Sequence, residues 1–253
     1  MKLFRIINLI FFFSVFLISE AFAGAYGATT TADTYKITVT RIELCASGST
    51  KTACSNSAVI FNGDSGAIDI ASTTAGAAAA SLGNLNKATI GTTYTWMQVT
   101  MKRSVTIKGG STALSTGSQA CYTNGTAGTS AQSALGSTSS AAAADTVVFM
   151  GIAGGSADDT NVNTTTAGDG TGTDAAAGAF DTGDDYLEWR GELTAPFTIK
   201  PGSIPSAKIA FGTSAALGFY NPNTLSNGCA LRAGGATNTG FYAAEPDVTI
   251  TLY

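Results

Sequence analysis

Alternating apolar and polar residues run through much of the chain from Tyr35 onwards. Tyr35, Ile37 and Val39 alternate with polar residues, and the apolar positions resume at Ile42. Because the side chains of a β-strand point alternately to its two faces, this pattern predicts a strand with one buried face. The change of phase predicts a β-bulge near Arg41, since one extra residue returns the apolar side chains to the same face.

Further segments also have the character of strands. After Gly91, one long segment places five apolar residues on the same face: Met97, Val99, Met101, Val105 and Ile107. Residues 59–61, and residues 67–70 apart from Asp69, are apolar on either side of Asn62-Gly63-Asp64, which predicts a hairpin. Towards the C-terminus, alternation over residues 248–252 predicts another strand.

Two polar segments interrupt this pattern. Residues from about 109 to 145 are rich in Gly, Ser, Thr and Ala, and residues 153–185 are rich in Asp, Asn, Thr and Gly. Such compositions bury little apolar surface, so we expect two long excursions from the core. The short strands and turn signals predict an all-β sandwich or barrel, and of the two we favour the sandwich. No Pro-rich or charged linker divides the chain, so residues 24–253 are expected to form a single domain.

The N-terminus has the form of an export signal. Lys2 and Arg5 precede an apolar run over residues 6–18, and Ala21-Phe22-Ala23 provides a cleavage site. The run is shorter than the roughly 20 residues that a helix needs to span a bilayer. We therefore expect removal of residues 1–23, no membrane span afterwards, and a secreted protein that is extracellular or lies at the cell surface.

Four cysteines, all beyond the export signal, predict two disulfides formed in an oxidising compartment. Cys45 and Cys54 flank a turn of small and polar residues, which favours a bond between them. Cys121 and Cys229 would then form the second bond. A metal cluster is the alternative, but the sequence has neither Cys-x-x-Cys spacing nor histidine to complete one.

The composition argues against most catalytic chemistry and against several partners. The chain has no histidine, so the Ser-His-Asp and Cys-His arrangements are excluded, and its glutamates stand in no recognisable motif. We expect no enzymatic activity and no cofactor. The net charge of −4 and the lack of basic clusters argue against nucleic acid as a partner.

The second polar excursion contains a candidate calcium site. Asp159, Asn161 and Asn163 have the spacing of the first EF-hand ligands. However, Thr164 and Gly170 stand where that motif needs Gly and Glu. A site of another geometry stays open, because calcium accepts oxygen ligands flexibly, although a solvated acidic loop is the simpler interpretation. The candidate ligands are Asp158, Asp159, Asn161, Asn163, Asp169 and Asp174.

Three segments resemble a group of exported bacterial domains of unknown function. They are residues 37–45, residues 67–71 and residues 91–99, the last with Gly-Thr-Thr-Tyr-Thr-Trp leading into a central strand. The resemblance covers about residues 34–108. It implies an immunoglobulin-like or prealbumin-like β-sandwich and a cell-surface or extracellular location, and it implies no activity.

One function that fits these features is a structural subunit of an extracellular filament, surface layer or matrix. Small residues, Thr-rich strand faces, low charge and disulfides all support it. Self-association would use strands at the two ends of the domain, because terminal strands expose backbone donors and acceptors unless they are covered. The candidate assembly residues are Tyr35, Ile37, Val39, Val248, Ile250 and Leu252.

The alternative is a monomeric adhesin or carbohydrate-binding module, whose partner would be a glycan. Such a protein stacks sugar rings on aromatic side chains. The candidate stacking residues are Trp96, Trp189, Tyr122, Tyr220 and Tyr242. Ordered fibres formed by the mature protein would select the structural subunit, and dispersed monomers would select the binding module.

Overall fold

The computed structural model describes residues 29–51, 53–72, 83–111, 120–126, 133–134, 136–137, 139–150, 162–163, 186–202, 205–219 and 241–253. Nearly all regular structure in these residues is β-strand, and η2 (Leu85–Lys87) and η3 (Ser140–Ala142) are short 3-10 helices. The all-β prediction is therefore confirmed. The expected export signal lies outside the described residues.

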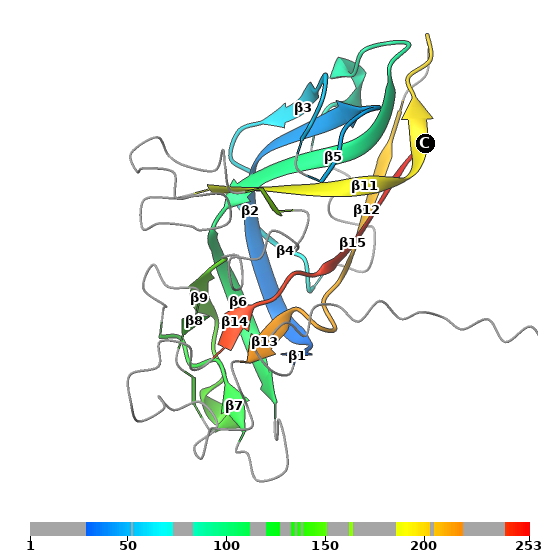
Figure 1. Ribbon diagram of the computed structural model, residues 1–253. Coiled ribbons are helices and arrows are strands. Elements are labelled where there is room, and N and C mark those ends of the chain that lie inside the picture. Colours follow the sequence, from blue (N-terminus) through cyan, green and yellow to red (C-terminus); the bar gives the residue numbers. More distant parts are fainter. Residues whose placement is uncertain are drawn as a thin grey trace, which may run out of the picture.

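The strand β2 (Ala32–Ala46) lies at the centre of the larger sheet. It pairs antiparallel with β5 (Thr93–Lys102) and β6 (Ser104–Ser111) along one side. Along its other side it pairs with β3 (Ala58–Asn62) and β4 (Ala67–Asp69). Figure 1 shows β2, in blue, passing from the lower strands of the molecule to the upper ones.

The ladders of β2 confirm one local prediction and correct another. Its register against β5 shifts between Val39 and Arg41, which confirms the expected bulge. The hairpin over residues 59–70 is wrong, because β3 and β4 each pair with β2 in the described ladders and not with each other. An apolar pattern shows which face of a strand is buried, but it does not show which neighbour the strand chooses.

The long segment after Gly91 forms two strands instead of one, because Arg103 interrupts it. The guanidinium Nε of Arg103 donates to the carbonyl oxygen of Met150 at 3.0 Å. The guanidinium carbon lies 5.8 Å from the ring centroid of Phe149. The strand breaks at the residue whose buried charge needs these partners.

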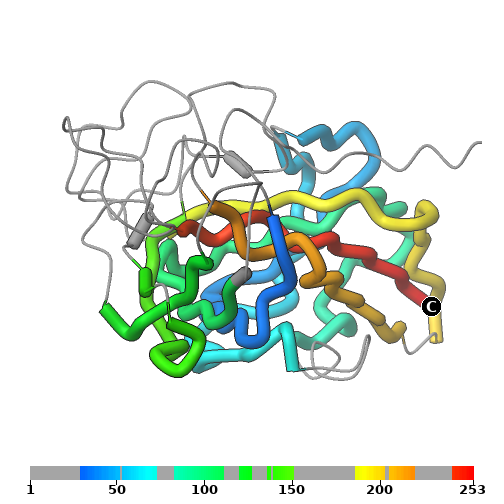
Figure 2. The backbone as a smooth tube through the Cα atoms, turned by 90° about the horizontal axis from the view of Figure 1, so that it is seen from below, coloured from blue at the N-terminus to red at the C-terminus, as the bar shows by residue number. Residues whose placement is uncertain are grey.

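The larger sheet continues into later parts of the chain. β11 (Tyr186–Thr198) pairs antiparallel with β5 and meets β15 (Asp247–Leu252) in parallel at Leu193 and Ile250. β15 also pairs antiparallel with β12 (Ala207–Gly212). β12 and β15 line a cavity together with β2 and β5, which gives the sandwich its second layer. In Figure 2 the red β15 runs between the yellow β11 and the orange β12.

The first polar excursion is partly folded, which corrects the expectation of a long loop over residues 109–145. Its described residues include the end of β6, then β7 (Cys121–Tyr122), β8 (Ser133–Ala134) and η3. Backbone hydrogen bonds join Tyr122 and Ser137 in both directions at 2.8 Å. Short strands of small residues can thus satisfy their backbone groups while burying little apolar surface.

Two short strands extend the larger sheet, and four other strands form a second sheet. β9 (Thr146–Phe149) pairs with β6, and β10 (Val162–Asn163) pairs with β11. A separate four-stranded sheet consists of β1 (Thr29–Thr30), β13 (Leu217–Phe219), β14 (Phe241–Ala243) and β8, and it lies at the lower end of the molecule in Figure 1. Apart from β10, the second polar excursion lies outside the described residues.

One apolar core lies between the packed layers. Leu44 and Met97 face it from β2 and β5, and Leu187 and Ile250 face it from β11 and β15; each is at most 1% exposed. A fully buried side chain of this size contributes about 1.5–3 kcal/mol. The described strands therefore form a β-sandwich, and the immunoglobulin-like or prealbumin-like type stays a prediction.

Candidate functional site

The strand β12 has one open side. It pairs with β15 on one side, and no described strand pairs with it on the other. Just before β12, the amide nitrogen and carbonyl oxygen of Ser206 both bond to Tyr253, at 3.3 Å and 2.9 Å. Backbone groups alternate in direction along an antiparallel strand. The N–H and C=O groups of Ala207, Ile209 and Phe211 therefore point away from β15.

The open edge has definite ends. Pro205 has no N–H group to offer, and the carbonyl oxygen of Thr213 accepts a hydrogen bond from the amide of Ala32 at 3.1 Å. Between them, no hydrogen bond from a described residue reaches the outward groups of β12. Natural sheets usually blunt such edges with proline or charge. Within β12 itself, Lys208 is the only charged residue.

The two faces of β12 differ sharply in polarity. Ala207, Ile209 and Phe211 lie opposite residues of the apolar face of β15, and Ile209 is buried. Lys208 is exposed on the other face. In the described part of the chain, the edge therefore combines outward backbone groups that have no partner with an apolar inner surface.

A cleft of about 270 Å³ lies beside the first half of β12. Ile42, Ile60 and Met97 line it from β2, β3 and β5, η2 lines it from one side, and β12 contributes Ala207 and Ile209. An extended segment that joins a sheet edge gains backbone hydrogen bonds, and pockets for alternate side chains give it specificity. The cleft and the open edge together suit such a segment.

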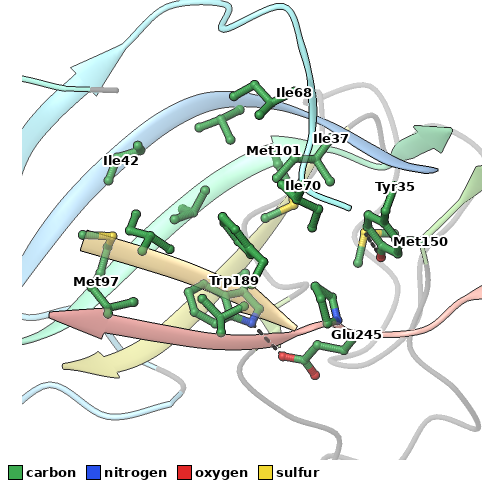
Figure 3. Close-up of a pocket in the computed structure, with 17 residues that line it drawn as sticks. Tyr35, Ile37, Ile42, Ile68, Ile70, Met97, Met101, Met150, Trp189 and Glu245 are labelled. Atoms are coloured by element: carbon green, nitrogen blue, oxygen red, sulfur yellow. Dashed lines mark hydrogen bonds between the residues drawn. The ribbon is translucent and has the colours of Figure 1, made fainter. Parts of the chain in front are cut away.

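A smaller, apolar cavity of about 70 Å³ lies deeper between the layers (Figure 3). Apart from Met1, all the methionines of the chain line it: Met97, Met101 and Met150. Methionine side chains are flexible and fill irregular gaps in cores. The volume is far below the roughly 300 Å³ of typical ligand pockets. We therefore assign this cavity to packing.

Two aromatic side chains place their polar tips at one end of the cavity, as Figure 3 shows. Trp189 Nε1 donates to Glu245 Oε1 at 2.7 Å, and the Tyr35 hydroxyl donates to the carbonyl oxygen of Ala244 at 3.0 Å. Burial, and secondarily the negative charge of Glu245, raise the pKa of Tyr35 well above its usual value. The segment before β15 thus accepts a hydrogen bond from the polar group of each ring. Because Trp189 is buried, it is not accessible to a sugar.

A charged network occupies the opposite face of β5. Gln98 Nε2 donates to Glu43 Oε2 at 2.8 Å and to Glu188 Oε1 at 3.4 Å. Each carboxylate also forms an ion pair with an arginine. Arg41 Nη2 lies 2.9 Å from Glu43 Oε1, and Arg190 Nη2 lies 2.9 Å from Glu188 Oε2. This balance of charges is typical of a structural ion-pair network and not of a proton-transfer pair.

Within the described residues, the network leaves one acceptor and one donor without a hydrogen-bond partner. These atoms are Gln98 Oε1 and Arg190 Nε, on side chains whose residues are only 6% and 4% exposed. Burial also lowers the pKa of Arg190, against the opposing effect of Glu188. An acceptor and a donor in one buried place suit a bound water molecule.

The disulfide loop closes over this network. The predicted Cys45–Cys54 bond is confirmed, with the two Cα atoms 5.1 Å apart. Within the loop, the carbonyl oxygen of Lys51 accepts from Arg190 Nη1 at 3.4 Å. Cys121 is buried in β7 and is disulfide-bonded, and its expected partner Cys229 lies outside the described residues. Disulfides are typical of proteins that mature in an oxidising compartment.

The calcium candidates stay a prediction. Asn163 lies in β10, whereas the remaining candidates lie outside the described residues. Among the residues that the structure describes, no group of three or more His, Cys, Asp or Glu is arranged to hold a metal ion.

The aromatic stacking candidates have mostly structural contacts. A Cβ atom added at Gly110 would overlap the ring of Tyr122, and one added at Gly218 would overlap the ring of Tyr242. These tyrosines therefore cover the backbone of the neighbouring strand. Tyr220 lies outside the described residues. Trp96 is partly exposed and lies across from Glu192, so it is the remaining accessible candidate.

The candidate assembly strands do not lie at an edge. Tyr35, Ile37 and Val39 belong to β2, which is paired on both sides, and β15 runs between β11 and β12. The expectation that terminal strands are open edges is wrong, because position in the sequence does not fix position in a sheet. Among the described strands, β12 is one that has an open side, and its strand character is visible in the sequence although its place in the sheet is not.

Comparisons of the chain with family models, curated proteins and solved structures found no match. In the described part of the chain, no helix has the length and apolar character needed to cross a membrane.

Proposed function

We propose that the protein is a structural subunit of an extracellular filament, surface layer or matrix, and that its subunits associate through the open edge of β12. The observation that carries this proposal is the run of outward backbone groups on Ala207, Ile209 and Phe211, bordered by a cleft with both apolar and polar lining residues. The Cys45–Cys54 bond and the expected export signal support an extracellular location.

Pairing at this edge is favoured because it breaks no strand contact among the described residues. The outward groups have no hydrogen-bond partner in the described part of the chain, whereas a paired strand gives them fixed partners and covers the cleft. Association through β2 or β15 would first have to break ladders on both sides of either strand. β12 is therefore a better assembly strand than β2 or β15.

The second candidate function is a carbohydrate-binding module. The observation that favours it is Trp96, a partly exposed aromatic residue on the polar face of β5. Stacking a sugar on this ring would need no subunit contact. A Trp96→Ala variant separates the two functions, because it should abolish glycan binding by a module and leave the assembly of a structural subunit unchanged.

The test uses mature protein, residues 24–253, with its disulfides oxidised. We expect sedimentation velocity to show larger species as concentration rises, and negative-stain microscopy to show ordered polymers or sheets. A protein that stays monomeric at all concentrations, and that binds glycans only while Trp96 is intact, would contradict the proposed function and support the binding module.

A further inference from the structure

We propose that β12 pairs antiparallel with β12 of a second copy of this chain, across a twofold axis at Ile209. The inference deepens the proposed function by naming one contact between subunits, and it rests on that function for its biological setting. A twofold contact closes at the dimer, so polymers of such dimers would use a second contact elsewhere on the subunit. The geometry itself follows from the register of β12 against β15.

The alternation of backbone groups makes this edge self-complementary. The outward residues Ala207, Ile209 and Phe211 are symmetric about Ile209. A twofold axis there places Ile209 opposite its own copy, and Ala207 opposite Phe211 of the second copy. Each of these pairs exchanges two N–H···O bonds, which gives about six bonds across the contact. No shift of register is needed to use every outward group.

The side chains of β12 also agree with a twofold contact. On the exposed face, Lys208 would lie opposite Ala210 of the second copy, so the single charge of the strand does not face its own copy directly. On the inner face, Ile209 would meet Ile209. Like charges directly opposite one another would destabilise the contact, and this register avoids them.

The apolar part of the cleft, lined by Ile42, Ile60 and Met97, can receive the inner side chains of the incoming strand. A strand added to β12 lies about 4.8 Å further along the sheet, beside η2 and over Ile42 and Ile60. Ile209 and Phe211 of the second copy would point to the same face as their counterparts and so towards the cleft. The β12 strand of a second copy would therefore do two things at once. Its backbone would pair with the open edge, and its inner side chains would cover the cleft.

Ala207→Pro is the deciding variant. Proline lacks an N–H group and its ring would project towards the second copy, but the amide of Ala207 makes no bond to β15. We expect the monomer to keep its melting temperature to within a few degrees. The dissociation constant of the dimer should rise at least about tenfold, as measured by sedimentation equilibrium.

Ala210→Pro is the matched control on the same strand. The amide of Ala210 points to Thr249 of β15, so proline there removes a bond inside the subunit. This variant should lower the melting temperature clearly. The contrast between adjacent outward and inward positions distinguishes loss of the contact from loss of the fold.

Disulfide cross-linking tests the register directly. The contact places residue 208 opposite residue 210 of the second copy as a pair without mutual hydrogen bonds, with Cα atoms about 4.5 Å apart, which suits a disulfide. A mixture of Lys208→Cys and Ala210→Cys should therefore form a cross-linked dimer under mild oxidation. Either variant alone should form several-fold less of it, because its own copies are diagonal neighbours.

The outcomes separate this inference from the proposed function. Dimers that are lost in Ala207→Pro, together with the mixed cross-link, support the twofold contact. Polymers that persist unchanged in Ala207→Pro overturn the twofold contact and association through β12, and they leave only the role of structural subunit standing. A wild-type protein that remains monomeric up to millimolar concentration overturns both.

Discussion

Gly191 occupies a place in the core where no side chain fits. A Cβ atom added there would overlap the ring of Trp189 and come within 3.0 Å of Ile250 Cδ1. The indole ring can therefore lie against the backbone of its own strand only because residue 191 has no side chain. We expect Gly191→Ala to lower the free energy of unfolding by about 1–3 kcal/mol through overpacking.

Chemical denaturation of the variant measures this cost. The control is the double variant Gly191→Ala with Trp189→Leu, in which the smaller side chain leaves room for the added methyl group. Its loss of stability should be smaller than the sum of the two single losses. Additive losses would show that the ring and the glycine are not in steric contact.

Tyr35 gives the stability of the protein a dependence on alkaline pH. Burial raises the pKa of its phenol above the value of about 10 expected in the unfolded chain. The folded state therefore keeps the proton when the unfolded state begins to lose it. The contribution of the protonated Tyr35 phenol to the free energy of unfolding is fully present below about pH 10. As the pH rises further, this contribution falls by up to about 1.4 kcal/mol per pH unit.

The comparison of wild type with Tyr35→Phe isolates this contribution. The variant loses the hydrogen bond to Ala244 and should be less stable at pH 8, but its free energy of unfolding should decline less between pH 8 and pH 11. Denaturant melts at several pH values measure both quantities. Parallel pH profiles for the two proteins would contradict the argument.

At the scale of elements, the loop between Cys45 and Cys54 closes a short ring over the charged network. The two cysteines are nine positions apart. In the chain-entropy model a ring of this size contributes about 2.7 kcal/mol. We expect the double variant Cys45→Ala with Cys54→Ala to lose about 2–3 kcal/mol of stability in denaturant melts.

The position of the loop adds a second, local effect. Without the bond, the carbonyl oxygen of Lys51 is no longer held near Arg190. Hydrogen exchange should therefore rise in residues 46–54 and at Arg190 in β11, and it should stay unchanged in β12. Uniform loss of protection across the sheet would indicate that the disulfide supports the whole fold and not this face.

The elements also show what the sequence could and could not predict. Alternation identified β2 and β15, and the phase shift identified the bulge near Arg41, because both depend on local side-chain periodicity. The choice of neighbour depends on contacts distant in sequence. For that reason the pattern gave a hairpin where β3 and β4 pair with β2.

The candidate site was accessible to sequence reasoning only in part. The Cys45–Cys54 pair could be inferred from its short spacing. The open edge could not, since β12 looks like any other short strand until its neighbours are known. The network of Glu43, Gln98 and Glu188 brings together residues from three strands, and no local motif marks it.

At the scale of the whole molecule, the central cavity leaves the two layers imperfectly packed. Val99 lines this cavity of about 70 Å³, so an added methyl group there has room. We expect Val99→Ile to raise the free energy of unfolding by about 0.5–1 kcal/mol. Val105→Ile is the control, because Val105 is 1% exposed and lines neither described cavity.

Thermal unfolding of both variants tests the packing argument. Val105→Ile should be destabilised by about 1–3 kcal/mol, since its surroundings are already filled. If Val99→Ile were destabilised to the same extent, the cavity would be too narrow for a methyl group and would be better described as ordinary core.

If the proposed assembly bears load, the double pairing of β2 has a mechanical consequence. Tension applied along β2 acts parallel to the strand, so the hydrogen bonds of its ladders must shear together and cannot open one at a time. Force applied across β12 acts at right angles to the strand and can peel its ladders from one end, including the ladder with β15. A load carried through β12 would therefore open the ladders of β12 before it disrupts those of β2.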